Sequence, residues 1–365
     1  MMQYIFKEQE LINEYRYIFL CGAQYKSGNQ QDKRNVLRKY LNEKNPLYCP
    51  IILEDNFMFR KDSSRILRYD DIHLKDLYQV EMLTNYLSDY NIIIHESIST
   101  GAETGLFLSE RRAFNKTCLL VPDETAVEEQ KVGKFMQYAF MKKPSVLRVI
   151  TFYPKIEKNM LSNDVMYWHT YFYDNKIGRK LDEQFQDFFE TADQTYRIKF
   201  TAYKENVKEG YIHYSYKKNS QHLIITALPR TLLNCIAAIF NIKEVSNKVF
   251  NAGYKELKEY IEDINSSLKE VFMNTIQEKT GEIFKECSIR PQMNVNNVHI
   301  AGITGMSLYF FQAAGFIDIK KADDYMKSNQ VKIIGKKVKD QKKNYFYARY
   351  SECITCAVET KIKVD

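Results

Sequence analysis

The chain has 365 residues, of which 45% are hydrophobic, and its formal net charge at pH 7 is +7. This length predicts about two domains with sizeable cores. No apolar stretch approaches the roughly 20 residues that a membrane-spanning helix needs, and the charged N-terminus lacks the apolar core of a signal peptide. The seven scattered cysteines fit a reducing compartment, so a cytoplasmic protein is expected.

The first 125 residues alternate between strand-like and helix-like patterns. Amphipathic helical spacing separates short apolar runs, and the runs end at CGAQ, LEDN, HESISTG and VPDE. Such alternation predicts an α/β domain, residues 1–125, with a doubly wound parallel sheet. Ligands of these sheets bind outside the carboxyl ends of the strands. Here those ends carry polar and hinge residues, so a ligand site is expected there.

The rest of the chain predicts an α+β region. Residues 126–230 form a middle segment that completes or covers the first domain, and the sequence gives it no function. Residues 231–290 have helical spacing, and a basic segment follows from Lys332 to Arg349, with seven basic residues, one acid and three aromatics. Helices followed by a basic two-stranded wing predict a winged-helix domain over 231–365, in contact with nucleic acid or a partner protein.

Two interpretations of the basic segment stay open. Basic residues interleaved with aromatics suit a nucleic-acid backbone and its bases, but a solvated hairpin with exposed lysines has the same pattern. The candidate nucleic-acid contacts are Lys336, Lys337, Lys339, Lys342, Lys343 and Arg349. No metal site or cofactor is predicted, because the lone CxxC at Cys353 and Cys356 lacks a second ligand pair.

The turn between residues 96 and 101 is the strongest candidate site. A helix that begins near Ser99, Thr100 and Gly101 would present free N–H groups to a phosphate or to sugar hydroxyls, and glycine permits close approach of a ligand. Glu103 is expected in the first turn of this helix, beside the same pocket. Its carboxylate could attack the anomeric carbon of a sugar. Alternatively, it could merely complement the helix dipole.

Four segments occur in the order and spacing of a known family. YIFLCGA, IILEDNF, LYQVEMLTNYLSDYNIIIHESISTGAETGLF and CLLVPDE resemble the nucleoside 2-deoxyribosyltransferase family. The likeness is closer still to the ribosyltransferase-like toxic effectors of bacterial retrons, which pair a reverse transcriptase with a small RNA–DNA hybrid. It covers residues 15 to 124, about a third of the chain.

The resemblance implies roles for individual residues. Glu103 matches the nucleophilic glutamate that forms a covalent sugar intermediate, and Glu81 matches an acid that contacts the nucleobase. The positions that match substrate contacts are Gly22, Ala23, Gln24, Glu54, Asp55, Ser97, Ser99, Thr100 and Gly101. Thr104 replaces the usual leucine after the glutamate, and it is expected to face the packing side of the helix.

Three other residues have two interpretations each. Glu96 could form an acid/base pair with Glu103, in which the pKa of one of the two carboxyls is raised, or it could accept backbone N–H groups. Arg34 and Arg38 lie one helical turn apart and could meet a phosphate, although a solvated helix face is the stronger expectation.

The resemblance implies an enzyme that cleaves an N-glycosidic bond of NAD or of a nucleotide. Such an effector would be held inactive by a reverse transcriptase and its RNA–DNA hybrid. Because members of the family often complete the pocket from a neighbouring subunit, a homo-oligomer or a larger complex is expected. Two alternatives remain: a nucleotide-sensing or nucleic-acid-binding module without turnover, and a nucleoside deoxyribosyltransferase of salvage.

Overall fold

The computed structural model describes most of the chain. The described residues are 2–11, 14–23, 25–26, 28–29, 32–56, 69–122, 134, 138, 148–152, 172–173, 176–192, 195–203, 207–217, 219, 221–322, 330–336, 353, 355 and 357–362. They fall into two compact units that are discontinuous in sequence. Unit 1 comprises residues 1–15, 56–87 and 195–365, and unit 2 comprises residues 16–55 and 88–194.

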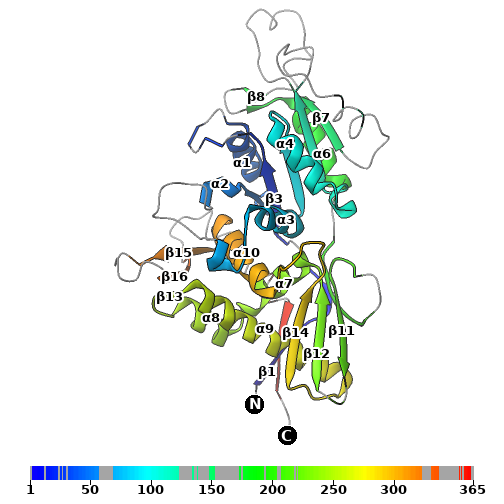
Figure 1. The fold of residues 1–365 in the computed structure, drawn as a ribbon, viewed down its shortest axis with the longest axis vertical. Helices are drawn as coiled ribbons and strands as arrows, with labels where there is room; N and C mark the ends of the chain where they lie inside the picture. The colour runs from blue at the N-terminus through cyan, green and yellow to red at the C-terminus, as the bar shows by residue number, and fades with distance from the viewer. Residues whose placement is uncertain are drawn as a thin grey trace, which may run out of the picture. The chain divides into compact units, whose positions relative to one another are not determined.

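Unit 2 is built on a five-stranded sheet in which all neighbouring strands are parallel (Figure 1). In spatial order the strands are β4 (Tyr48–Ile51), β3 (Arg16–Cys21), β5 (Tyr90–Ile94), β6 (Thr117–Pro122) and β7 (Arg148–Phe152). The chain leaves β3 for β4 on one side and later continues to β5 on the other. The strand order therefore reverses between β3 and β5, which is where open α/β sheets bind ligands.

Helices pack on both faces of this sheet. Ile18 and Leu20 of β3 join a core with residues of α1 (Lys33–Lys44) and α6 (Arg179–Thr191). Between them, Phe19 points to the opposite face, since successive strand residues alternate, and its ring lies 5.6 Å from that of Phe107 in α4 (Ile98–Phe107). The structure is thus mixed α/β with a parallel sheet.

Smaller elements complete unit 2. They are the short helix α2 (Leu53–Asn56), the 3-10 turn η3 (Arg111–Ala113) and the paired strands β8 (Phe172–Tyr173) and β9 (Lys176–Ile177). β7 and α6 lie beyond the predicted domain boundary at residue 125. β7 extends the sheet by pairing with the outer edge of β6, and α6 packs its apolar residues into the core on one face of the sheet.

Unit 1 contains a mixed sheet and a group of helices. The sheet order is β14 (Glu286–Pro291), β12 (His222–Ala227), β11 (Tyr211–Lys217), β10 (Arg197–Ala202) and β2 (Gln9–Glu10). β11 and β12 form an antiparallel hairpin, but β10 and β11 are parallel. The main helices are α3 (Leu77–Leu87), α7 (Pro229–Ile239), α8 (Lys243–Phe250), α9 (Leu257–Thr280) and α10 (Ile300–Ala313).

The core of unit 1 surrounds α7 and α10. Every residue of α7 is buried, as its apolar sequence predicts. Its Arg230 is only 1% exposed, because it donates to Glu14 and stacks on Tyr196. On α10, Gly305 lets the 3-10 turn η2 (Tyr69–Ile72) approach closely, since an added Cβ would lie 2.6 Å from that of Ile72.

The remaining strands of unit 1 lie in two small sheets. β15 (Ile317–Lys321) and β16 (Gln330–Gly335) are antiparallel, and β16 also pairs with β13 (Lys255–Glu256). β1 (Met2–Phe6) pairs with β17 (Val358–Ile362). β16 covers the start of the basic segment and pairs with the preceding strand β15, so the hairpin expected within the basic segment itself stays a prediction. Residues 337–352, which carry most of the basic segment, lie outside the described part of the chain.

The structure also bears on the domain organisation expected from sequence. Residues 176–192 join unit 2, whereas residues 195–227 join unit 1. The contiguous segments 1–125, 126–230 and 231–365 remain a prediction about functional domains. Within the described residues, no helix is both long and apolar enough to cross a bilayer.

Candidate active site

The helix that carries Glu103 begins earlier than the sequence indicated. Ser97 is its N-cap and forms a capping box with Thr100, so that α4 begins at Ile98. Glu103 therefore lies in the second turn of α4, and the expectation that it lies in the first turn was wrong. The helix dipole acts mainly within the first turn. A role in complementing the dipole therefore explains the position of Glu103 less well than it would for a first-turn residue.

Glu103 contacts the end of the central strand. The thiol of Cys21, the last residue of β3, donates a hydrogen bond to Oε2 of Glu103. The two residues come from elements on the two sides of the strand-order reversal, because β3 pairs with β5 and α4 follows β5. Glu103 therefore lies at the carboxyl edge of the sheet, where the fold places ligands.

The surroundings of Glu103 act on its pKa in opposite directions. Burial raises the pKa of Glu103, and the negative charge of Glu54 raises it further. The hydrogen bond from Cys21 and the positive charge of Arg34 lower it. The net effect is a raised pKa, because removing a carboxylate from water disfavours its charged form.

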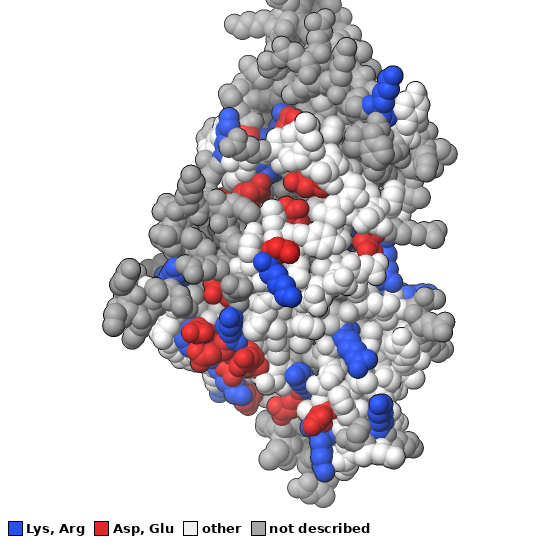
Figure 2. Space-filling view, viewed as in Figure 1, with Lys and Arg blue, Asp and Glu red and all other residues white. Residues whose placement is uncertain are grey.

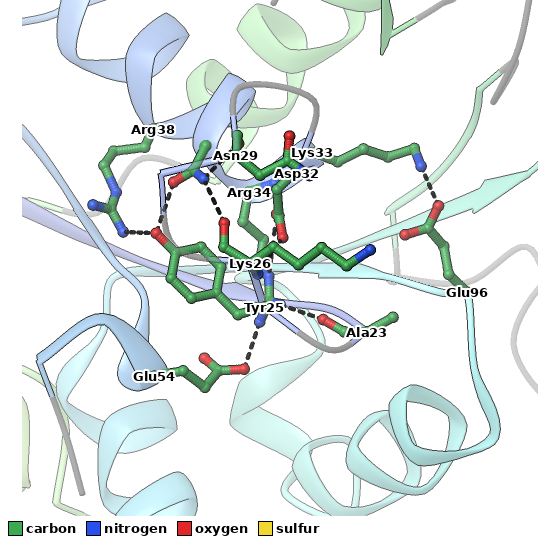
Figure 3. Close-up of polar contacts among 11 residues, drawn as sticks. Ala23, Tyr25, Lys26, Asn29, Asp32, Lys33, Arg34, Arg38, Glu54 and Glu96 are labelled. Carbon is green, nitrogen blue, oxygen red and sulfur yellow. Dashed lines mark hydrogen bonds and ion pairs between the residues drawn. The ribbon is translucent and has the colours of Figure 1, made fainter. Parts of the chain in front are cut away.

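Arg34 is the buried centre of this polar cluster (Figure 3). Its side chain is 2% exposed, its Nη1 donates to Oε1 of Glu54 at 2.6 Å, and its Nη2 donates to the carbonyl of Ala23. The guanidinium also lies 4.9 Å from the ring centre of Tyr25. The expectation of a solvated helix face was wrong for Arg34, because paired carboxylate and carbonyl acceptors satisfy its donors inside the fold.

Gly22 provides the space that Arg34 occupies. A Cβ at this position would lie 3.3 Å from both Cδ and Nε of Arg34. Such contacts are tighter than ordinary van der Waals packing, so a side chain would press on the guanidinium. Gly22 is therefore needed because it leaves room for the Arg34 side chain, and not because its backbone adopts an unusual angle.

Arg38 forms a second, more exposed pair one turn along α1. Its Nη1 lies 2.6 Å from Oδ2 of Asp55. Its Nη2 donates to the hydroxyl of Tyr25 (Figure 3). Both side chains of the ion pair are between a fifth and a third exposed. Glu54 and Asp55, predicted as substrate contacts, thus each have an arginine partner from α1.

Glu96 pairs with Lys33 of α1 (Figure 3). Each side chain of this pair is about one fifth exposed. The carboxylate that raises the pKa of Glu103 is Glu54, and the acid/base role of Glu96 stays a prediction.

The hydroxyls of the turn divide into structural and exposed groups. Thr100 is fully buried, and its Oγ1 accepts from the backbone N–H of Ser97 and donates to the Ser97 carbonyl. Ser99 is exposed and lies 2.7 Å from Ser97, Oγ to Oγ. Thr104 is buried and bonds to the Thr100 carbonyl, as expected for the packing side of the helix. Among these predicted contacts, Ser99 has the side chain most open to a ligand.

His95 lies directly behind this turn. Its ring lies near Gly101, where an added Cβ would be 3.5 Å from Cε1. Burial lowers the pKa of His95, although the charge of Glu96 opposes that effect. The ring is therefore neutral near pH 7, as suits a packed histidine at the end of a strand.

Some predicted site residues are not brought together here. Glu81 lies on α3 in unit 1, whereas Glu103 belongs to unit 2, so their cooperation stays a prediction. Gln24 lies outside the described residues, as do Lys337, Lys339, Lys342, Lys343 and Arg349. Lys336 is described and directly follows β16.

Two members of the cluster, Cys21 and Lys33, were not predicted from the sequence, and the burial of a third, Arg34, was not expected. The signal for Cys21 was its place at the end of the strand before the CGAQ loop. The signal for the basic residues was weaker, since an N-terminal turn rich in Lys and Arg opposes the helix dipole and needs acidic partners. In the described part of the chain, no group of three or more His, Cys, Asp or Glu could hold a metal ion.

These features define a parallel α/β protein with a carboxylate site at the reversal of strand order. The chain belongs to the STM3845 retron effector protein family, whose model matches residues 30–348. This match spans most of both units and confirms the expected resemblance to retron effectors. A comparison with curated proteins found no match.

Proposed function

We propose that this retron effector cleaves an N-glycosidic bond of NAD or of a nucleotide, with Glu103 as the nucleophile. The observation that carries the proposal is the position of Glu103, which is half-buried at the strand-order reversal and accepts a hydrogen bond from Cys21. A carboxylate there can attack the anomeric carbon while the base leaves with the electrons of the C–N bond. Water or another acceptor then releases the sugar from the glutamate.

The neighbouring charges support this chemistry. Arg34 and the Cys21 thiol favour the ionised carboxylate, which is the nucleophilic form, whereas burial and Glu54 oppose it. Burial also strengthens any attraction between the carboxylate and a sugar that develops positive charge. Ser99, exposed at the start of α4, is suited to contact the sugar or a phosphate.

We further propose that the effector acts in anti-phage defence and is held inactive by a retron reverse transcriptase and its RNA–DNA hybrid until infection. Membership of the retron effector family supports this part. The C-terminal part of unit 1 is the proposed contact region. There α9 and α10 pack together, with a hydrogen bond between Thr304 and Asn265, beside the three-stranded sheet of β13, β16 and β15.

That arrangement supports a winged-helix interpretation in part. The order α8, β13, α9, α10, β15, β16 places helices before an antiparallel wing, but β14 intervenes and joins another sheet. On the face shown in Figure 2, acidic side chains gather over the region of α8 and α9, and basic side chains of the described residues are scattered. We therefore assign the proposed nucleic-acid contact to the basic segment after β16 and not to this face.

A product analysis tests the catalytic part. Purified protein and its Glu103→Gln variant are incubated with NAD and with a panel of nucleotides and deoxynucleotides, and released base is measured. The wild type should release base from one class, and the variant should lose nearly all activity because a carboxamide is a poor nucleophile. Glu43→Gln, on an exposed face of α1, is the matched control and should remain active.

If the purified wild type releases no base, it is either an enzyme that lacks its trigger or a binding module. The assay is therefore repeated with the co-expressed retron partners and after phage infection. Continued absence of base release under those conditions would overturn the glycosidase proposal and favour a nucleotide-sensing module.

A further inference from the structure

The two carboxyl oxygens of Glu103 have different surroundings. Oε2 accepts the hydrogen bond from the Cys21 thiol, and Cys21 itself is only 5% exposed. Within the part of the chain that the structure describes, no hydrogen bond to Oε1 is formed. The two oxygens of a free carboxylate are equivalent, so the thiol is what distinguishes them here.

We propose that Cys21 is a positioning residue, whose thiol fixes Oε2 of Glu103 and leaves Oε1 as the oxygen that attacks the sugar. This inference rests on the proposed function of Glu103 as the nucleophile. In the step, Oε1 forms a bond to the anomeric carbon, and the C–N bond breaks with its electron pair leaving on the base. The thiol proton stays on sulfur throughout, so Cys21 is neither acid nor nucleophile.

The position of Cys21 makes this role specific. It ends β3, where the parallel pairing with β5 places it opposite Ile93, while the pairing with β4 on the other side ends at Phe19. A donor on a rigid strand orients a partner better than one on a mobile loop. Cys118 on β6 offers a comparison, because it is also buried but, among the described residues, its thiol forms no hydrogen bond with a carboxylate.

The thiol also favours the charged state of Glu103. Because a hydrogen bond to the ionised form stabilises that form, it offsets part of the effect of burial and of Glu54. Loss of the donor should therefore both loosen the carboxylate and make it easier to protonate. If Cys21 served only to fill space, replacing it would change neither the orientation of the Glu103 carboxylate nor its protonation.

The test compares the wild type with Cys21→Ala, Cys21→Val, Cys21→Ser and the control Cys118→Ala. The first readout is the pH profile of kcat/KM for base release. The second is isotope-edited infrared spectroscopy of labelled glutamate, with the Glu103→Gln spectrum subtracted to assign the Glu103 carboxyl band. Melting temperatures establish that each variant is folded, and Cys21→Val fills the volume of the sulfur without providing a donor.

The two apolar variants should move the acidic limb of the profile to higher pH and lower kcat/KM about tenfold at pH 6. Cys21→Ser, whose hydroxyl can donate, should recover most of the loss, and Cys118→Ala should match the wild type. The infrared titration of Glu103 should move in the same direction as the profile.

An unchanged infrared titration in both apolar variants would overturn the positioning role. The spectroscopic readout does not require turnover, so it decides the role of the thiol even if no substrate is cleaved. Absence of base release from the wild type, with its partners and after infection, would instead overturn the proposed function.

Discussion

The guanidinium of Arg34 and the carboxylate of Glu54 lie 2.6 Å apart, Nη1 to Oε1, in the same charged cluster as Glu103. The arginine is almost fully buried, whereas the glutamate is one third exposed. The two charges act on Glu103 in opposite senses, Arg34 lowering its pKa and Glu54 raising it. A change in the Arg34–Glu54 pair should therefore affect both the stability of the loop after β3 and the charge state of Glu103.

Replacing Arg34 by alanine should reduce both stability and activity. The change removes the donors to Glu54 and to the Ala23 carbonyl, and we expect a loss of about 2–4 kcal/mol in the free energy of unfolding. Arg38→Ala, which breaks the more exposed pair with Asp55, should cost about 1 kcal/mol or less. Urea denaturation of the two variants measures both values. Equal losses would show that burial of Arg34 contributes little.

Two glycine substitutions should have opposite effects on the free energy of unfolding. Gly22→Ala brings a Cβ to 3.3 Å from the buried Arg34 side chain, and we expect a loss of about 1–2 kcal/mol. Gly105→Ala, in α4, meets nothing within 4 Å. It should therefore stabilise the helix by about 0.5–1 kcal/mol. Thermal denaturation of both variants checks the signs, and destabilisation by Gly105→Ala would contradict the description of an open helix face.

Glu103→Gln should stabilise the protein in a pH-dependent way. Burial raises the pKa of Glu103 in the folded state above the ordinary glutamate value of 4.5, so the folded protein binds this proton more tightly than the unfolded chain. Stability is then lost as pH rises from the ordinary value through the raised one. The variant should thus melt at a higher temperature than the wild type at pH 8, and at the same temperature below pH 4. A variant that is less stable at pH 8 would disprove the raised pKa.

The same pKa sets the expected acid limit of activity. Since the nucleophile must be ionised, base release should fall as pH drops through the raised pKa of Glu103. This fall should occur at higher pH than an ordinary glutamate would give. The pH profile of kcat/KM reports this value for the free enzyme, and an acid limb at the ordinary glutamate value would contradict the expectation.

Serine substitutions in the turn separate structure from substrate contact. Ser97→Ala removes the N-cap of α4 and should cost about 1 kcal/mol of stability. Ser99 is exposed, so Ser99→Ala should change stability by less than about 0.5 kcal/mol. If Ser99 contacts the sugar or a phosphate, its loss raises KM about tenfold while the melting temperature is unchanged. An unaltered KM would remove Ser99 from the site.

Much of unit 2 could be predicted from local sequence. The apolar runs became β3, β5 and β6, and the amphipathic pattern after the first loop became α1. Local hydrophobic periodicity determines such elements, because each strand or helix buries a definite face. Alternating strands and helices likewise indicated a parallel sheet. A parallel sheet in turn indicated that the site would lie at the carboxyl ends of the strands.

Tertiary structure decided what those side chains do. The sequence indicated Glu103 as a site residue. Its hydrogen bond from Cys21, however, joins positions 82 residues apart, and such a contact cannot be predicted from hydrophobic periodicity. Arg34 looked like a surface residue because only the folded chain places Glu54 and the Ala23 carbonyl around it. Local pattern fixes which face of an element is buried, whereas the charge and partners of a buried polar group depend on residues that only folding brings near.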